Sequence, residues 1–144
     1  MTTRLKPGIR SEFRFHVPVS KTVPALYPEA EEFQEMPEVF ATGFLVGFLE
    51  WACIQAINPY INWPDQQTLG THINVSHIAA TPPGMTVTAM VTLVQVDGRR
   101  LVFDVEAHDG VDTISRGTHE RFLIDRKKFE DKISDKASRL TKTP

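Results

Sequence analysis

The spacing of hydrophobic residues changes at about residue 58. Residues 39–57 form an almost unbroken apolar run, VFATGFLVGFLEWACIQAI, and a helix that is apolar on all sides must be covered on all sides. After the loop at 58–67, apolar and polar residues alternate with the period of two that is typical of strands. The pattern therefore predicts one long buried helix followed by a sheet.

The alternating part divides into four strands rich in Val, Thr, Ile and Leu, expected at 69–80, 85–96, 100–108 and 112–124. The breaks between them hold Pro-Pro-Gly at 82–84 and Asp-Gly at 97–98 and 109–110. Asp-Gly favours tight hairpins because their turns need a positive φ. We expect these strands to follow one another as an antiparallel meander.

The part of the chain before the helix is less regular. Residues 11–17, SEFRFHV, alternate and predict a first strand. The prolines that follow favour an extended, looping segment, with a short helical turn around 29–35. The long helix should begin between Pro37 and Gly43 and end before Pro59, because proline cannot continue a helix.

These elements make an α+β fold. One long apolar helix beside about five antiparallel strands is best hidden by a curved sheet wrapped around it, which is the hotdog architecture. The tail at 126–140 adds a short amphipathic helix, expected to lie on the surface, with apolar residues at 129, 133, 137 and 140. A single sheet leaves part of the helix and one sheet edge uncovered, so we expect a homodimer that closes both.

The composition narrows the class of protein. The 144 residues carry 16 basic and 18 acidic side chains, and the net charge of −2 gives no reason to expect a nucleic-acid or membrane partner. The one cysteine, Cys53, excludes a disulfide framework or a cysteine-rich zinc site and suits a reducing compartment. The length fits a single domain over residues 1–144, and no secretory signal is recognisable, so a cytoplasmic protein is expected.

Glu50 is the most informative residue of the chain. It lies within the apolar run, where an ionised carboxylate would be costly in a bilayer, so we do not expect this run to span a membrane. Charged residues are almost never buried without a partner or a function. Glu50 either pairs with an arginine in a structural role or takes part in chemistry, and we favour the second.

Strand alternation gives the direction of His77. In the sequence THINVSH, Ile73, Val75 and His77 share one face, and the apolar companions mark it as the face that meets the helix. His72 then points to solvent or to a second subunit. A lone inward histidine is more often a core residue than a catalyst, but an inward Glu50 could orient the imidazole and raise its basicity.

Thr42 stands near the expected start of the helix. Threonine is a favoured N-cap residue, and helix N-termini also present free N–H groups that can hold an oxyanion, so a structural and a functional role are compatible. Thr42 precedes Glu50 by two helical turns, about 12 Å along a straight helix. A site that uses both residues needs a bridging water, substrate or residue, or contributions from two subunits.

The other polar candidates are weaker. His119 and Arg121 share a face of the last strand, where Arg121 could bind an anionic part of a ligand or simply lie exposed. His16 and His108 are expected at exposed strand positions. Histidines and acids show no metal-site spacing, so no metal is expected, and nucleophile elbows, phosphate-binding glycine loops and dinucleotide fingerprints are absent.

Longer stretches of the sequence match one known family. They are KTV and LYPE within 21–29, PEVFATGF at 37–44, EWAC at 50–53, AATPPG at 79–84, GRRL at 98–101, HDGVD at 108–112 and GTHER at 117–121. On these motifs, from about residue 8 to residue 130, the chain resembles the fluoroacetyl-CoA thioesterase family of single-domain hotdog hydrolases.

The resemblance implies a homodimeric hotdog enzyme that hydrolyses short acyl-CoA thioesters with no cofactor. It places the family's catalytic threonine, glutamate and histidine on Thr42, Glu50 and His77. The family's substrate-contacting glycine and arginine fall on Gly70 and Arg121.

The resemblance also implies a lid over the acyl pocket that bears aromatic residues, one of which is Phe33. Met36 departs from the fluoroacetyl-specific pattern, which has phenylalanine at this position. Methionine adapts to differently shaped ligands, whereas a phenylalanine ring is rigid. The resemblance therefore supports the hydrolase chemistry more strongly than fluoroacetyl selectivity.

Three functions follow as hypotheses. The favoured one is hydrolysis of short-chain acyl-CoA thioesters, a fluoroacetyl-like one among them, with His77 as general base. Glu50 would orient His77 or attack the carbonyl, and Thr42 would hold the carbonyl oxygen or supply the nucleophile. The alternatives are hydration or dehydration of an acyl thioester on the same fold, and a non-catalytic acyl-CoA-binding module in which Glu50 and His77 form a structural pair.

Overall fold

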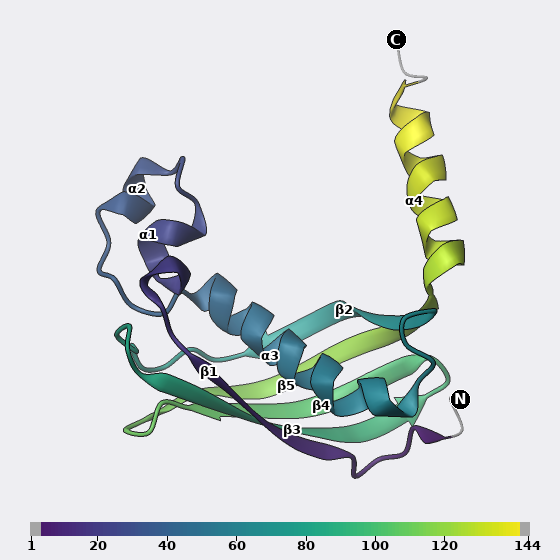
Figure 1. Ribbon diagram of the computed structural model, residues 1–144, viewed down its shortest axis with the longest axis horizontal. Helices are drawn as coiled ribbons and strands as arrows, with labels where there is room; N and C mark the ends of the chain where they lie inside the picture. Colours follow the sequence, from purple (N-terminus) through teal and green to yellow (C-terminus); the bar gives the residue numbers. More distant parts are fainter. Residues whose placement is uncertain (1–3, 142–144) are drawn as a thin grey trace.

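The computed structural model describes residues 4–141. Figure 1 shows one sheet that curves beneath a long helix, α3 (Thr42–Ile57). The expected α+β architecture, a curved antiparallel sheet around one central helix, is thus confirmed. The strands are β1 (Arg10–His16), β2 (Gln66–Val75), β3 (Thr86–Asp97), β4 (Arg100–His108) and β5 (Thr113–Asp125).

The order of the strands across the sheet is β1-β3-β4-β5-β2, and every neighbouring pair is antiparallel. The three strands joined by Asp-Gly turns form the expected meander, and Gly98 and Gly110 take positive φ values of 61° and 92°. The prediction that β2 continues this meander was wrong, because β2 pairs with β5 instead. Links of two and four residues, at 98–99 and 109–112, force their strands to be neighbours, whereas the longer proline-containing link after β2 does not.

The edge strand β2 ends earlier than expected, at Val75 rather than near residue 80. Its register shifts between Gly70 and His72, which leaves one extra residue in the strand as a bulge. Gly70 therefore lies opposite Arg121 of β5, and Ile73 lies opposite the buried His119. Both positions face the helix, although simple alternation would place them on opposite faces.

Helix α3 begins and ends as the sequence predicts, but its N-cap residue and its cover differ from the prediction. Its N-cap is Ala41, so Thr42 is the first helical residue and does not cap the helix with its side chain. Seven side chains of α3 are buried in the core, whereas Trp51 is 46% exposed, so one chain does not cover the helix all round. No helix in the described part of the chain is long and apolar enough to cross a membrane.

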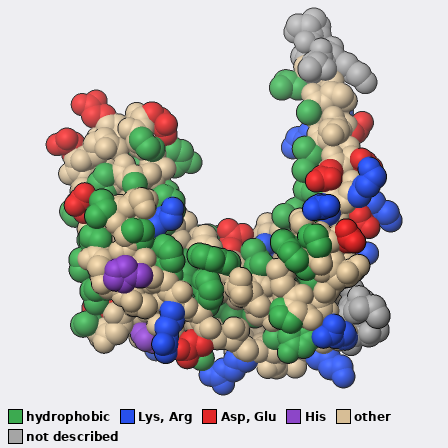
Figure 2. All heavy atoms as spheres, in the orientation of Figure 1, with side chains coloured by type: hydrophobic (Ala, Val, Ile, Leu, Met, Phe, Trp, Pro, Cys, Tyr) green, Lys and Arg blue, Asp and Glu red, His purple; other side chains and the backbone are tan. Residues whose placement is uncertain are grey.

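A segment of residues 17–41, here called the flap, rises over the N-terminal end of α3 (Figure 1). It contains α1 (Val23–Leu26) and the expected helical turn, α2 (Glu31–Gln34). Helix α1 was not predicted from the sequence, because proline usually breaks a helix but is tolerated in its first turn, where Pro24 lies. Figure 2 shows acidic side chains gathered at the outer end of the flap.

The tail forms α4 (Arg126–Thr141), which confirms the helix but not its expected position. Figure 1 shows it rising away from the sheet rather than lying on it. Because β5 ends at Asp125 and α4 begins at the next residue, there is no turn that could fold the helix back onto the sheet. Its apolar residues Ile133 and Leu140 are consequently exposed.

Candidate active site

The first cluster of predicted site residues is a hydrogen-bonded pair at the start of α3. Thr42 Oγ1 lies 2.7 Å from His77 Nδ1, although the two residues are 35 positions apart in the sequence. The pair opens into a cleft of about 320 Å³. The cleft is lined by Val23, Val39, Phe40, Thr42, His77, Ile78, Ala79 and Ala80.

The surroundings of the His77 imidazole favour its neutral form, in which it can act as a base. Burial lowers its pKa from the ordinary value, and a hydrogen bond with the backbone of Ala79 acts in the opposite direction. The other ring nitrogen, Nε2, is buried and has no hydrogen-bond partner among the described residues. A neutral imidazole with one nitrogen on a hydroxyl has the geometry of a general base.

Hydrogen bonds of Thr81 connect the two segments that carry Thr42 and His77. Its carbonyl accepts the N–H of Phe40 at 2.8 Å, just before Thr42. Its hydroxyl donates to Asp109 at 2.8 Å, and this carboxylate also accepts two N–H groups of its own turn, at 3.0 and 2.8 Å. The segment that bears His77 is thereby fixed to both the helix start and the β4–β5 turn.

The second cluster is centred on an ion pair between α3 and β5. Arg121 Nη1 lies 2.9 Å from Glu50 Oε1, and the two side chains are 3% and 37% exposed. The sequence left two roles open for Glu50, pairing with an arginine or taking part in chemistry, and the structure shows that the arginine partner is Arg121. Glu50 is only partly buried, and within one chain it does not contact His77, which it was expected to orient.

Arg121 is held from several sides. Its Nε donates to Thr68 Oγ1 at 2.9 Å, and its Nη2 donates to the Thr68 carbonyl at 2.7 Å. Its Nη1 also lies 3.0 Å from His119 Nε2. An arginine fixed in this way presents its charge in one direction only.

Gly70 leaves the space that this cluster needs. A Cβ atom added there would lie 2.6 Å from Glu50 Oε1 and 3.2 Å from His119 Cε1. The cluster opens into a cleft of about 460 Å³. The cleft is lined by Val46, Glu50, Gly70, Thr71, His72, Ile73 and His119.

The two clusters are separate within one chain. Thr42 and His77 form one, and Glu50, Gly70 and Arg121 form the other. Two turns of α3, about 12 Å, lie between Thr42 and Glu50. The structure therefore brings together Thr42 with His77, but it does not bring Glu50 to either of them.

The two expected lid residues lie on the flap. Phe33 belongs to α2, and its ring packs beside Tyr27 with centroids 5.9 Å apart. Met36 is 47% exposed. Neither side chain lines the two clefts of this chain.

Sequence reasoning missed the supporting roles of Thr68 and Thr81. Thr68 lies in none of the matched motifs, and Thr81 lies in AATPPG at 79–84 without any sign of its role, since a threonine in a strand or loop is common. His119 was recognised only as a weaker candidate that shares a strand face with Arg121. By contrast, His16 and His108 are exposed, as expected.

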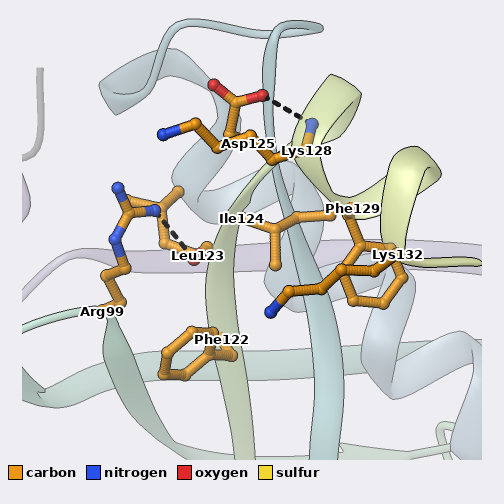
Figure 3. A pocket seen from close by; sticks show the side chains of 8 residues that line it. All are labelled: Arg99, Phe122, Leu123, Ile124, Asp125, Lys128, Phe129 and Lys132. Carbon is orange, nitrogen blue, oxygen red and sulfur yellow. Dashed lines mark hydrogen bonds between the residues drawn. The ribbon is translucent and has the colours of Figure 1, made fainter. Parts of the chain in front are cut away.

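Other polar and hollow places lie outside the two clusters. Burial raises the pKa of the Cys53 thiol to about 12, which leaves it unreactive. The described residues contain no group of three or more His, Cys, Asp or Glu that could hold a metal ion. A further cleft of about 290 Å³ lies at the base of α4, beside Phe122 and Phe129 (Figure 3), and none of the predicted site residues lines it.

Comparison with known proteins identifies the family. A family model described as fluoroacetyl-CoA-specific thioesterase matches residues 24–127. The chain belongs to this thioesterase family. A curated family member, the fluoroacetyl-CoA thioesterase of Streptantibioticus cattleyicolor, is 54% identical over 136 residues, which are 94% of this chain and 97% of that protein.

Solved structures agree with this family and with the hotdog fold. A threonine-to-serine variant of the fluoroacetyl-CoA thioesterase, in complex with acetyl-CoA, has a TM-score of 0.89 and 54% identity, covering 92% of this chain and 98% of that one. A hot-dog-like protein from Thermanaerovibrio acidaminovorans has a TM-score of 0.77 at 19% identity, covering 94% and 95% of the two chains. The second likeness concerns the fold alone.

Proposed function

We propose that this protein is a cytoplasmic acyl-CoA thioesterase that hydrolyses short-chain acyl-CoA to free acid and CoA without a cofactor. The observation that carries the proposal is the 2.7 Å contact between Thr42 and His77, in a chain that belongs to a thioesterase family. The reaction breaks the C–S bond, forms a C–O bond to the oxygen of water, and returns a proton to the CoA sulfur.

His77 acts as the general base in this proposal. Its low pKa keeps it unprotonated at neutral pH, and its Nδ1 can take a proton from the Thr42 hydroxyl or from a water beside it. The first turn of α3 presents free N–H groups beside Thr42, which suits them to hold the carbonyl oxygen as negative charge develops.

The complete site is proposed to form in a homodimer. Strand β2 is a sheet edge, and Glu50 beside it is 37% exposed. The buried Nε2 of His77 has no partner in the described part of its own chain. A two-fold dimer that pairs β2 with its copy would bring Glu50 of the partner subunit toward His77, and this would give each dimer two composite sites.

Subunit complementation tests the composite site. The variants Thr42→Ala and Glu50→Gln are each expected to lose most activity as homodimers. After the two are mixed and exchanged, about half of the dimers are heterodimers, and each of these holds one intact site. Activity should recover to about a quarter of the wild-type value. No recovery, with exchange confirmed by native mass spectrometry, would mean that each chain holds its site alone.

Release of free thiol from a panel of acyl-CoAs tests the reaction itself. Hydrolysis releases CoA with a free thiol, whereas hydration of an enoyl-CoA or simple binding does not. We expect turnover with acetyl-, propionyl- and fluoroacetyl-CoA, and a loss of about a hundredfold in His77→Ala. Tight binding without thiol release across the panel would rule out this function.

The panel also tests the acyl preference. We expect Met36→Phe to raise the ratio of fluoroacetyl- to acetyl-CoA turnover, because a rigid ring in the lid selects shape more strongly than methionine does. Met36→Leu is the matched control, since it keeps a flexible aliphatic side chain. An unchanged ratio in Met36→Phe would place the selectivity elsewhere in the site.

A further inference from the structure

His119 is a buried titratable side chain beside the ion pair, and the proposed reaction gives it no role. It is 2% exposed, lies in β5, and lines the cleft that contains Glu50 and Gly70. Its Nδ1 lies 2.7 Å from the carbonyl oxygen of His72, and its Nε2 lies 3.0 Å from Arg121 Nη1. Both ring nitrogens are therefore engaged.

These two contacts fix the position of the imidazole proton. A carbonyl oxygen can only accept a hydrogen bond, so His119 Nδ1 carries the proton and donates to His72. A guanidinium can only donate, so His119 Nε2 is unprotonated and accepts from Arg121. The ring is held in one neutral tautomer.

The Nη1 atom of Arg121 carries two N–H groups and faces two acceptors. One is Glu50 Oε1 at 2.9 Å, and the other is His119 Nε2 at 3.0 Å. Thr68 holds Nε and Nη2 of the same guanidinium. Without an acceptor at His119, one buried N–H would lose its partner, and the guanidinium would turn toward another acceptor.

We propose that His119 is a positioning residue, which accepts one hydrogen bond from Arg121 and so keeps the guanidinium aimed at Glu50 beside Gly70. The effect on turnover rests on the proposed thioesterase function, whereas the hydrogen-bond arrangement does not.

Acid should disturb this arrangement. A protonated His119 would point an N–H at the N–H of Arg121, and the contact would become repulsive. Burial already lowers the pKa of His119, the hydrogen bond to the His72 carbonyl opposes this effect, and the charge of Arg121 adds to it. The groups that face the ring are Arg121 on β5, Glu50 on α3, the His72 carbonyl on β2, and apolar Phe103 on β4. Glu120 is next to His119 in β5 but points to the other face of the sheet, and its charge, like that of Glu50, raises the pKa of His119.

Nitrogen NMR of the histidine rings in the full-length protein tests the arrangement without any substrate. We expect His119 to show the Nδ1–H neutral tautomer at neutral pH and to titrate with a pKa below the ordinary histidine value of about 6.5. Assignment uses the His119→Gln and His16→Gln variants. A His119 signal with a pKa at or above the ordinary histidine value, or one that carries its proton on Nε2, would overturn the proposal.

Kinetics of matched variants test the effect on the site. We expect His119→Phe, which keeps the volume but has no acceptor, to lower kcat/KM at least tenfold, and His119→Gln, whose side-chain oxygen can accept from Arg121, to recover a large part of it. His16→Gln should leave kcat/KM unchanged. Equal losses in the Phe and Gln variants with unchanged Tm would contradict positioning through Arg121. If no variant and no wild-type protein releases thiol, the function fails, and the NMR result still decides the hydrogen-bond arrangement.

Discussion

Position 70 has room for a hydrogen atom but not for a methyl group. The added carbon of a Gly70→Ala variant would lie 2.6 Å from Glu50 Oε1, so the carboxylate must move away from Arg121. Gly70 does not have a positive φ, so the backbone itself tolerates alanine. We expect kcat/KM to fall at least tenfold while the Tm changes little.

Gly47→Ala is a suitable control for that experiment. Gly47 lies on the same helix as Glu50, and an added Cβ there would meet no atom within 4 Å. Alanine also favours a helix over glycine, so this variant should be active and slightly more stable. Wild-type kcat/KM in Gly70→Ala would show that the Glu50 carboxylate need not stay where it lies.

The buried His119 and the half-buried His77 should make the protein less stable in mild acid. Burial lowers the pKa values of both His77 and His119. Below about pH 6.5 the unfolded chain binds protons at these positions that the folded chain does not, so stability rises with pH through this window and is complete above it. The free energy of unfolding, from urea titrations, should be lower at about pH 5.5 than at about pH 7.5.

Replacing both histidines by glutamine should flatten that dependence. His16→Gln supplies the matched control, because it makes the same change at a histidine that folding leaves exposed. The carboxyl groups whose pKa is lowered, Asp109 and Glu120, titrate below this window and do not interfere. Equal stability at both pH values in the wild type would contradict the expected effect of burial.

At the scale of elements, the link between β2 and β3 depends on one buried carboxylate. Asp109 accepts hydrogen bonds from the Thr81 hydroxyl and from two N–H groups of the β4–β5 turn. Removing this acceptor leaves buried donors unpaired, so Asp109→Ala should lower the free energy of unfolding by about 2 kcal/mol. It should also lower kcat, because the loop that carries His77 loses its anchor.

Denaturant unfolding and turnover measure these two effects together. The neighbouring Asp112 offers a control, because it is exposed and contributes its backbone to the turn, so Asp112→Ala should change little. An Asp109→Ala variant with lowered stability and unchanged kcat would show that the His77 loop is fixed by other contacts.

The sequence predicted those elements whose form depends on local spacing. The limits of α3, the hairpins at the two Asp-Gly turns and the first strand all follow from proline, glycine and alternation close by in the chain. The pairing of β2 with β5 and the partner of Glu50 could not be predicted in the same way. Both depend on which distant segment lies alongside, and an arginine such as Arg121 looks the same in a strand sequence whether it is buried or exposed.

The same limit applies to the direction of α4. Its amphipathic spacing predicts a helix, but the spacing does not say what covers the apolar side. Thr42 illustrates the opposite case, because its place at a helix start was predictable, whereas its contact with His77 needs the fold to bring together residues 35 positions apart.

At the scale of the whole molecule, the proposed dimer makes a further prediction. β2 is one of the two edges of the sheet, and it lies beside Glu50. Val75→Pro in β2 should weaken β2-to-β2 pairing, because the Val75 N–H points away from β5 and proline removes it. Sedimentation velocity should then show a monomer at concentrations at which the wild type is a dimer, with activity lost in parallel.

The other sheet edge provides the control for that experiment. Arg14→Pro in β1 alters the edge that lies opposite β2 across the sheet and should leave a dimer. If Val75→Pro remains a dimer with full activity, then the subunits associate through another surface.

The bulge between Gly70 and His72 has a consequence for how this family can vary. Because of the one extra residue, two positions of β2 that are three residues apart, Gly70 and Ile73, both face the helix. The strand therefore lies beside both Arg121 and His119. A relative without this extra residue would have a regular strand, in which only one of these two positions could face the helix. The length of this strand, as much as the identity of its residues, is therefore a condition for a working enzyme.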